Sequence, residues 1–337
     1  MTDQPESDQP DTLPESPPEP IPGSTQDAPV SLNLIDRFSA FSGNVRGAIW
    51  ILMAAMIFSI AVALIKAIGT RLPVFEILLV RQAVILVATL PVIYRYFPQA
   101  VITRNPWLHV ARVFLALIAM YAGFTAVVHL PLADATALGF AKSFFITIFA
   151  IVFLKEVVGI RRWLAIIIGF AGVLVMLRPD AGGINIYGVM AVVGAAAAGL
   201  VMVIIRYLSR FDKPVTILIY QTVFVGLLAL PFALYQWVWP TPREALILVA
   251  IGLVSMLGQM CNIRAFAAGE ATAIATLDYT RLLWATIIGF IVFTETPSAA
   301  TLTGAAIIIG ASIYTVWRES KRGQKLSRSP AGRGYTT

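Results

Sequence analysis

Residues 270–295, EATAIATLDYTRLLWATIIGFIVFTE, are apolar enough to cross a bilayer, yet they carry Asp278 and Arg281 near the middle. Ionisable groups in hydrocarbon are costly, and they usually face a polar interior or a solute pathway. A near-copy, DATALGFAKSFFITIFAIVFLKE, occupies residues 134–156 and has Lys142 as its central cation. A membrane segment that is used twice in this way indicates a transporter built from two repeats.

The composition is that of a membrane protein. Hydrophobic residues make up 58% of the chain and charged residues 13%, against about 25% charged in soluble domains. The apolar residues fall into blocks of the length that spans about 30 Å of hydrocarbon as a helix. We therefore predict an all-α membrane protein with ten transmembrane helices, at approximately 47–68, 75–94, 107–129, 133–154, 161–178, 186–206, 214–236, 244–267, 271–293 and 300–317.

The two halves of the chain correspond residue by residue at an offset of 139 to 141. The matched pairs include Gly47 with Gly188, Lys66 with Arg206, Lys142 with Arg281, and Glu156 with Glu295. The pattern predicts a first repeat at 46–178 and a second at 186–317. Each repeat has five spans, an odd number, so the second starts from the opposite side and the two repeats are inverted.

The two ends of the chain differ in charge. Residues 1–36 are acidic and rich in proline, and we expect a disordered tail because such a segment buries too little apolar surface to order itself. Residues 318–337 form a basic tail. With both termini in the cytoplasm, the cytoplasmic segments hold 17 of the 25 Lys and Arg residues and the opposite side holds four. This asymmetry predicts that orientation, in a bacterial inner (plasma) membrane.

Lys142 and Arg281 are the first candidates for solute binding. Each lies nine or ten residues into its span, close to the bilayer midplane at 1.5 Å per residue. In inverted repeats the two cations would face each other across the pseudo-twofold axis. Asp278 has two interpretations: an i,i+3 ion pair with Arg281 that lowers the cost of insertion, or a site of proton coupling that a substrate carboxylate releases from Arg281.

Further polar residues within the spans complete the candidate substrate site: Arg81, Tyr279, Gln259 and Asn262. In the ninth span, spacings of three or four residues predict one polar face, formed by Glu270, Ile274, Asp278, Arg281 and Trp284. Asp134, Leu138 and Lys142 repeat this spacing in the fourth span.

Three charged residues near span ends are harder to assign from sequence. Arg112 lies in the first turns of its span, where its side chain either snorkels to the surface or turns inward. Glu156 has Lys155, Arg161 and Arg162 nearby, which favours a structural ion pair. Glu295 has no cation nearby in the sequence, so the sequence leaves its role open.

Catalytic, metal and nucleic-acid sites are not predicted. Two histidines and the single Cys261 form no metal-binding or nucleophilic pattern, and no Gly-rich phosphate loop is present. The expected partners are a small-molecule solute and membrane lipid, without cofactor, metal or nucleic acid. The sequence carries no indication of the oligomeric state.

The ten spans, the inverted repeats, the Glu that closes spans four and nine, and the Ile-Ile-Ile-Gly runs in spans five and ten resemble the EamA-like transporters of the drug/metabolite transporter superfamily. The resemblance implies a central cavity lined by spans 1, 3, 4, 6, 8 and 9. The family often has a proline partway along spans four and nine, where this chain reads FAKSFF and YTRLLW. Cations in place of proline suggest a partly anionic or zwitterionic solute.

We therefore predict a secondary transporter that moves a small organic metabolite by alternating access. A narrower alternative is an uptake carrier for a zwitterionic or vitamin-like solute, such as S-adenosylmethionine or riboflavin. A membrane scaffold or an intramembrane enzyme is the alternative from another class. Polar residues at the midplane disfavour the scaffold, and the missing nucleophile or metal ligands disfavour the enzyme.

Overall fold

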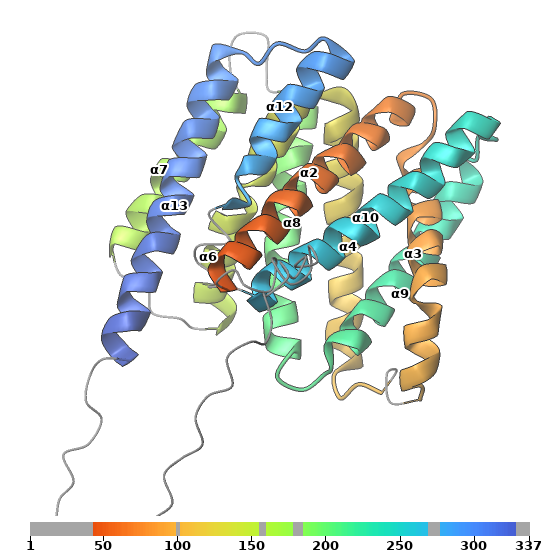
Figure 1. The fold of residues 1–337 in the computed structure, drawn as a ribbon, viewed down its shortest axis with the longest axis horizontal. Helices are drawn as coiled ribbons and strands as arrows, with labels where there is room; N and C mark the ends of the chain where they lie inside the picture. Colours follow the sequence, from red (N-terminus) through yellow and green to blue (C-terminus); the bar gives the residue numbers. More distant parts are fainter. Residues whose placement is uncertain (1–42, 99–101, 155–159, 178–184, 269–276, 328–337) are drawn as a thin grey trace, which may run out of the picture. The chain divides into compact units, whose positions relative to one another are not determined.

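A computed structural model describes most of the helical part of the chain (Figure 1). All described residues belong to one compact unit, Ser42–Thr337. The described ranges are 43–98, 102–154, 160–177, 185–268 and 277–327, and within them the secondary structure is α-helical with no strand. The predicted acidic tail at 1–36, Glu156 and residues 270–276 lie outside these ranges.

The helices follow the predicted apolar blocks. In the first half they are α2 (Gly43–Gly69), α3 (Val74–Tyr96), α4 (Pro106–His129), α5 (Leu132–Gly139), α6 (Lys142–Leu154) and α7 (Ile160–Leu177). In the second half they are α8 (Ile186–Leu208), α9 (Pro214–Tyr235), α10 (Pro242–Ala268), α12 (Thr280–Phe293) and α13 (Ala299–Ser327). Pro91 inside α3 and its repeat counterpart Pro231 inside α9 both lie within continuous helices.

Seven helical segments among the described residues are long and apolar enough to cross a membrane. Three shorter apolar helices, Ile166–Leu177, Thr280–Phe293 and Ala299–Ala311, occupy the places of the predicted fifth, ninth and tenth spans. A helix rises about 1.5 Å per residue, so the seven segments of 18 to 27 residues suffice for a hydrocarbon core of about 30 Å. The protein is therefore a multi-pass helical membrane protein.

The predicted fourth span is not one continuous helix. It is interrupted at Phe140 and Ala141, between α5 and α6. Here the amides of Phe140 and Ala141 bond to Ala137 and Leu138, three residues back, which is the tighter 3₁₀ pattern. The predicted shared face of Asp134, Leu138 and Lys142 is therefore wrong, because a 3₁₀ turn changes the rotation of the helix between the two halves.

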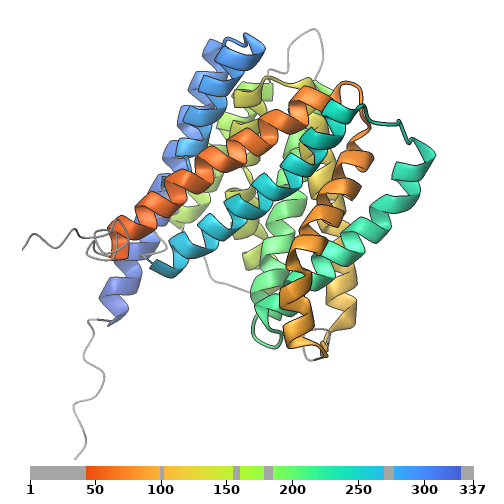
Figure 2. The same cartoon turned by 45° about the vertical axis from the view of Figure 1, so that its right-hand side comes forward.

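Helices from different repeats make the most extensive contacts (Figure 2). α2 packs on α10, α4 on α8, α3 on α9, and α7 on α13. Exchanging each helix for its repeat counterpart converts the α2–α10 pair into α8–α4, and it leaves the α3–α9 and α7–α13 pairs unchanged. The packing thus repeats along with the sequence.

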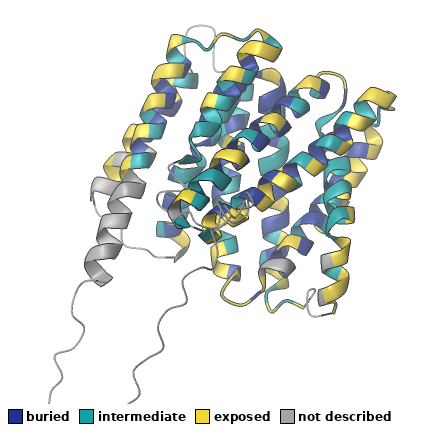
Figure 3. Ribbon diagram, in the orientation of Figure 1, coloured by how far each residue is buried: buried dark blue, intermediate teal, exposed yellow. Residues whose placement is uncertain are grey.

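Many residues on the helices are exposed (Figure 3), and a large number of them are large and apolar. Phe114, Leu227 and Phe290 are each exposed by more than half. In a soluble protein such surfaces would indicate a binding interface. Around apolar helices of this length they are the expected lipid-facing surface.

Candidate functional site

Two turns that precede helices lie near the candidate cations. Lys142 is the first residue of α6, directly after the interruption of the fourth span. In the ninth span Asp278 and Tyr279 form a turn, α12 begins at Thr280, and Arg281 is its second residue. Each cation therefore lies at the start of a helix that follows a turn. Asp278 and Arg281 share one face of this turn, because their side chains form an i,i+3 ion pair. Glu270 and Ile274 of the predicted polar face lie outside the described residues.

The two interruptions are in direct contact. The ring of Phe140 packs edge to face on the ring of Tyr279, with centroids 4.8 Å apart. α5 and α12, which lead away from these residues, also pack against each other. The repeat symmetry that the sequence suggests thus brings the two non-helical turns to one place in the fold.

Arg281 has several partners at this place. Its Nη2 donates to Asp278 Oδ1 at 2.8 Å, and its guanidinium lies 4.8 Å from the centre of the Phe58 ring. Ser59 Oγ donates to the backbone oxygen of Arg281 at 3.2 Å. The Arg281 and Asp278 side chains are 23% and 22% exposed, so the ion pair is only partly buried.

Lys142 belongs to the same cluster without a bonded partner. It interacts electrostatically with both Arg281 and Asp278. Within the described part of the chain its ammonium has no hydrogen bond or ion pair. Asp278 already bonds to Arg281, so the cluster of these three residues carries an excess of one positive charge.

Arg81 belongs to a separate polar cluster between α3 and α10. Its Nε donates to Ser255 Oγ at 3.1 Å and its Nη1 to Gln82 Oε1 at 3.0 Å. Its guanidinium lies 5.9 Å from the centre of the Phe124 ring. Arg81 therefore faces the helix bundle.

Of the weaker candidates, one lies in the Lys142 cluster and the other two lie on α10 outside it. Tyr279 lies at the interruption itself, as described above. Gln259 is exposed on α10 and Asn262 is half-buried there, and neither has a polar contact with the Lys142 cluster among the described residues. Phe58, Ser59, Phe140 and Ser255 are contact residues that sequence reasoning missed. Only the two serines carried a signal, as hydroxyl groups within apolar spans.

Arg112 does not snorkel to the surface. Its side chain is fully buried, Nη1 donates to Gln221 Oε1 at 2.9 Å, and Nη2 donates to the backbone oxygen of Ile217 at 2.8 Å. Both acceptors are on α9. These two acceptors replace the hydration that snorkelling would have provided, so the surface alternative is wrong.

A buried hydrogen bond between His109 and Asp212 lies one turn from Arg112. His109 Nε2 is 2.8 Å from Asp212 Oδ2 in the α8–α9 turn, and Thr103 Oγ1 donates to the same oxygen at 2.7 Å. Burial raises the pKa of Asp212, but the hydrogen bonds from His109 and Thr103 together lower it further, so the net pKa lies below the ordinary value. The ionised carboxylate therefore stabilises the fold.

We expect Asp212→Asn to lower the thermal unfolding midpoint of the detergent-solubilised protein at pH 7, through a loss of about 1.5–3 kcal/mol for hydrogen bonds to a charged group. Because the pKa of Asp212 is lower in the folded protein than in the unfolded chain, its carboxylate stabilises the fold fully above the unfolded pKa of about 3.9. This stabilisation is lost as the pH falls through the folded pKa. The midpoints of the two proteins should therefore converge below about pH 4. A difference that persists unchanged to pH 3 would contradict the assignment.

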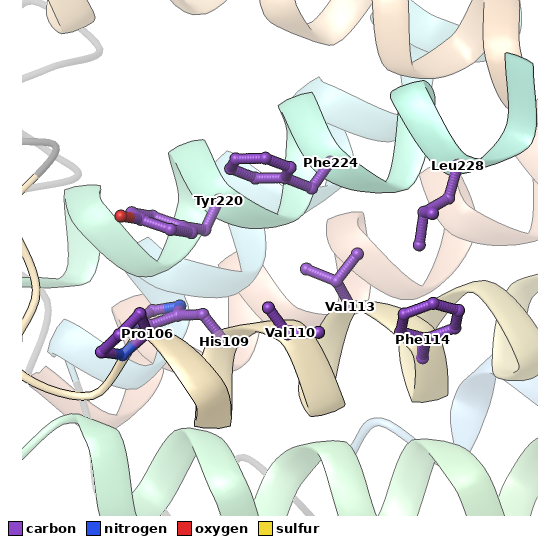
Figure 4. A pocket seen from close by; sticks show the side chains of 8 residues that line it. All are labelled: Pro106, His109, Val110, Val113, Phe114, Tyr220, Phe224 and Leu228. Atoms are coloured by element: carbon purple, nitrogen blue, oxygen red, sulfur yellow. The ribbon is translucent and has the colours of Figure 1, made fainter.

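A cavity of about 380 Å³ lies between α4 and α9 (Figure 4). Its lining is apolar apart from the polar groups of His109 and Tyr220, and it includes none of the predicted site residues. Val110, Phe114 and Phe224, which line it, are exposed on the outer surface. This groove is on the lipid-facing side of the bundle, so we do not assign the solute site to it. Metal-binding groups of three or more His, Cys, Asp or Glu residues are absent among the described residues.

Comparison with known proteins identifies the family of this chain. The model of the EamA-like transporter family matches twice, at residues 45–178 and 185–317. The S-adenosylmethionine uptake transporter of Rickettsia prowazekii is 28% identical over 275 residues, covering 82% of this chain and 94% of the relative. A riboflavin transporter of Brucella anthropi is 31% identical over 260 residues, with 75% and 92% coverage.

A third relative and a solved structure extend the comparison. The pseudopaline exporter of Pseudomonas aeruginosa is 32% identical over 273 residues, covering 79% of this chain and 94% of the relative. A crystal structure that is 19% identical matches with a TM-score of 0.55, over 84% of this chain and 99% of its own. That likeness supports the fold alone. The two matches of the family model and the helical repeats together lead to one conclusion: this chain belongs to the EamA-like transporter family.

Proposed function

We propose that this protein is an inner-membrane secondary transporter that moves a small zwitterionic metabolite by alternating access. The observation that carries the proposal is the meeting of Lys142, Asp278 and Arg281 at two turns, one from each repeat, each at the start of a helix. Non-helical backbone within a membrane is tolerated where it is buried in protein or lines a cavity. Interrupted helices at the interface of two repeats are the usual place of a transporter's binding site.

The charges of the cluster favour a solute with both signs. Lys142 has an uncompensated positive charge and suits a carboxylate. Asp278 suits an ammonium or another cation once the solute carboxylate competes for Arg281. Phe58, Phe140 and Tyr279 surround these groups with aromatic surface, against which an apolar or ring-bearing part of the solute can pack. We include Arg81, Gln259 and Asn262 as weaker contacts on α3 and α10.

S-adenosylmethionine is the first solute to test. It combines an α-amino acid, a sulfonium cation and an adenine ring. Its carboxylate suits Lys142 and Arg281, one of its two cations suits Asp278, and its adenine suits the aromatic surface. A relative of this chain is named for its uptake. Riboflavin and pseudopaline, for which other relatives are named, are the comparison solutes.

The proposed architecture has ten spans in two inverted repeats, 46–178 and 186–317, flanked by tails at 1–36 and 318–337. The cross-repeat packing pairs support a twofold relation, and the Lys and Arg distribution supports cytoplasmic termini. An impermeant thiol reagent that labelled a Ser320→Cys variant from outside intact cells would contradict this orientation.

Uptake of radiolabelled S-adenosylmethionine into proteoliposomes tests the proposal. We expect saturable flux that unlabelled S-adenosylmethionine inhibits and that protein-free liposomes lack. If none of the three solutes is transported, the proposed solute class is contradicted. Transport of any of them would exclude a scaffold.

The same measurement between pH 5.5 and 8 tests proton coupling. The Asp278→Asn variant cannot bind a proton at this position, so its transport should depend less on pH. An unchanged pH profile would exclude coupling through Asp278.

A further inference from the structure

Lys66 and Glu295 form an ion pair that the sequence did not predict. Lys66 lies in the last turn of α2, and Glu295 follows the end of α12. Their Nζ and Oε1 atoms are 2.6 Å apart, and the side chains are only 11% and 19% exposed. The Phe293 ring lies 5.5 Å from Nζ and covers the pair on one side. The role of Glu295, which the sequence left open, is therefore in part an ion pair with a residue distant in the sequence.

Both side chains also bind the connection between α4 and α5. The second carboxylate oxygen of Glu295 accepts a hydrogen bond from the Leu132 amide at 2.7 Å, at the first residue of α5. A carboxylate at a helix N-terminus interacts favourably with the helix dipole. Lys66 Nζ donates to the backbone oxygen of Leu130. One ion pair therefore joins three segments: the end of α2, the end of α12 and the start of α5.

The two short helices α5 and α12 extend from this ion pair to the solute cluster. α5 starts at Leu132 and ends just before the interruption that precedes Lys142. α12 starts beside Arg281 and ends just before Glu295. The 14 residues of α12 correspond to about 21 Å at 1.5 Å per residue. α5 ends and α12 begins in turns near the solute cluster. A movement of these turns when a solute binds would therefore shift the other ends of the two helices, where the ion pair lies.

We infer that Lys66 and Glu295 are a latch that closes the solute pathway at the α2 and α12 ends and opens once in each transport cycle. The inference rests on the proposed alternating-access transport. A static contact between these helices would be at least as stable if it were apolar. A partly exposed ion pair differs because water can hydrate both charges when it separates, so closed and open arrangements can be close in energy.

Chemical cross-linking of the latch provides the first test. In a Cys261→Ala background, Lys66→Cys and Glu295→Cys are joined with a short bifunctional methanethiosulfonate reagent. Cross-linking should lower the flux of the double-cysteine variant at least about tenfold relative to the same variant before treatment, and reduction should restore it. The reagent should leave the flux of each single-cysteine variant equal to that of the same variant untreated. The thermal shift produced by the transported solute should persist in the cross-linked protein. Full flux through cross-linked protein would overturn the inference.

A second measurement needs neither a known solute nor a cross-linked variant. Thr280→Cys, beside Arg281, reports access to the cluster from the latch side through its labelling rate with a small impermeant thiol reagent. Adding Lys66→Gln should raise that rate about tenfold, the ratio expected when a charge-assisted hydrogen bond is lost. An unchanged rate would overturn the latch.

The matched control is Arg71→Gln, which removes a cation from the Arg71–Glu244 ion pair. That pair joins the α2–α3 connection to α10, and among the described residues Arg71 forms its hydrogen bonds with Glu244 and Trp239, not with α5 or α12. Its loss should leave the labelling rate of Thr280→Cys unchanged. If Arg71→Gln and Lys66→Gln raised the labelling rate of Thr280→Cys equally, the loss of any surface ion pair would make the helix bundle more accessible. That result would also overturn the inference. If the labelling result is as expected but no solute is transported, only the proposed solute class fails.

Discussion

Replacing Arg281 with methionine should weaken solute binding by at least about 100-fold. The guanidinium is the donor that a solute carboxylate would share with Asp278, and methionine keeps the apolar length of the side chain without its charge. Truncating one member of a hydrogen-bonded charge pair costs about 2–5 kcal/mol, and about 2.7 kcal/mol corresponds to 100-fold. The partial exposure of Arg281 places the expected loss in the lower part of this range. Binding is measured by the thermal shift of purified protein with increasing S-adenosylmethionine.

Two variants control this measurement. Arg281→Lys keeps the charge but loses the planar fork of donors, and we expect intermediate affinity. Arg71→Met removes an arginine from an ion pair outside the cluster, and its affinity should be that of the unchanged protein. If Arg281→Met folds and binds the solute with unaltered affinity, the Lys142 cluster is not the binding site.

The second large effect concerns helix packing, where Gly304→Leu should prevent α7 and α13 from packing. A Cβ on Gly304 would lie 2.7 Å from the backbone oxygen of Gly172 and 2.3 Å from Met176 Cγ. A backbone oxygen cannot move aside as a flexible side chain can, so the helices must separate. We expect a loss of about 3 kcal/mol, the upper part of the usual range for overpacking. The measurements are the yield of monodisperse protein and its thermal midpoint.

Gly310→Leu is the matched control for this variant. Gly310 lies on the same helix, and nothing comes within 4 Å of a Cβ built there. The same side chain should therefore be tolerated at this position, with a midpoint near that of the unchanged protein. Equal losses for the two variants would mean that the helix tolerates leucine poorly at any glycine, and the close-approach argument would fail.

The sequence predicted those features of the fold that depend on composition and repetition. Helices need apolar blocks of a certain length, and the blocks can be counted. The two-repeat architecture follows from the constant offset, and the family match confirms it. The count of ten spans stays a prediction, because three of the helices are shorter than a full span among the described residues. Gly172 and Gly304 mark a close approach of α7 and α13, where a Cβ on either residue would lie within 3 Å of a backbone oxygen.

The interruptions beside Lys142 and Arg281 were not predicted. Proline is the strongest sequence signal for a broken helix, and neither interruption contains one. Gly139 precedes the first interruption and is only a weak signal. The turn at Asp278 and Tyr279 has no glycine at all. These turns depend on contacts between the repeats, such as the Phe140–Tyr279 ring contact, and such tertiary contacts are absent from the local sequence.

The partners of Arg112 and Glu295 were missed for a related reason. Sequence reasoning placed each charge by its depth in its own span and by neighbouring charges. Glu295 instead pairs with a lysine more than two hundred positions earlier, and Arg112 bonds to an amide and a carbonyl on α9. Long-range polar pairs have no periodic signature in one sequence, so the structure was needed to identify them.

The packing of helices from different repeats has a consequence for biosynthesis. α2–α10, α3–α9, α4–α8 and α7–α13 each join a helix made early to one made late. When the first half enters the bilayer, its main packing surfaces lack their partners until the second half is translated. The duplicated halves are thus not independent folding domains. In the late steps of assembly, helices of the second half must pack against helices of the first half that are already in the bilayer. An insertion error in the second half would therefore leave helices of the first half without their packing partners.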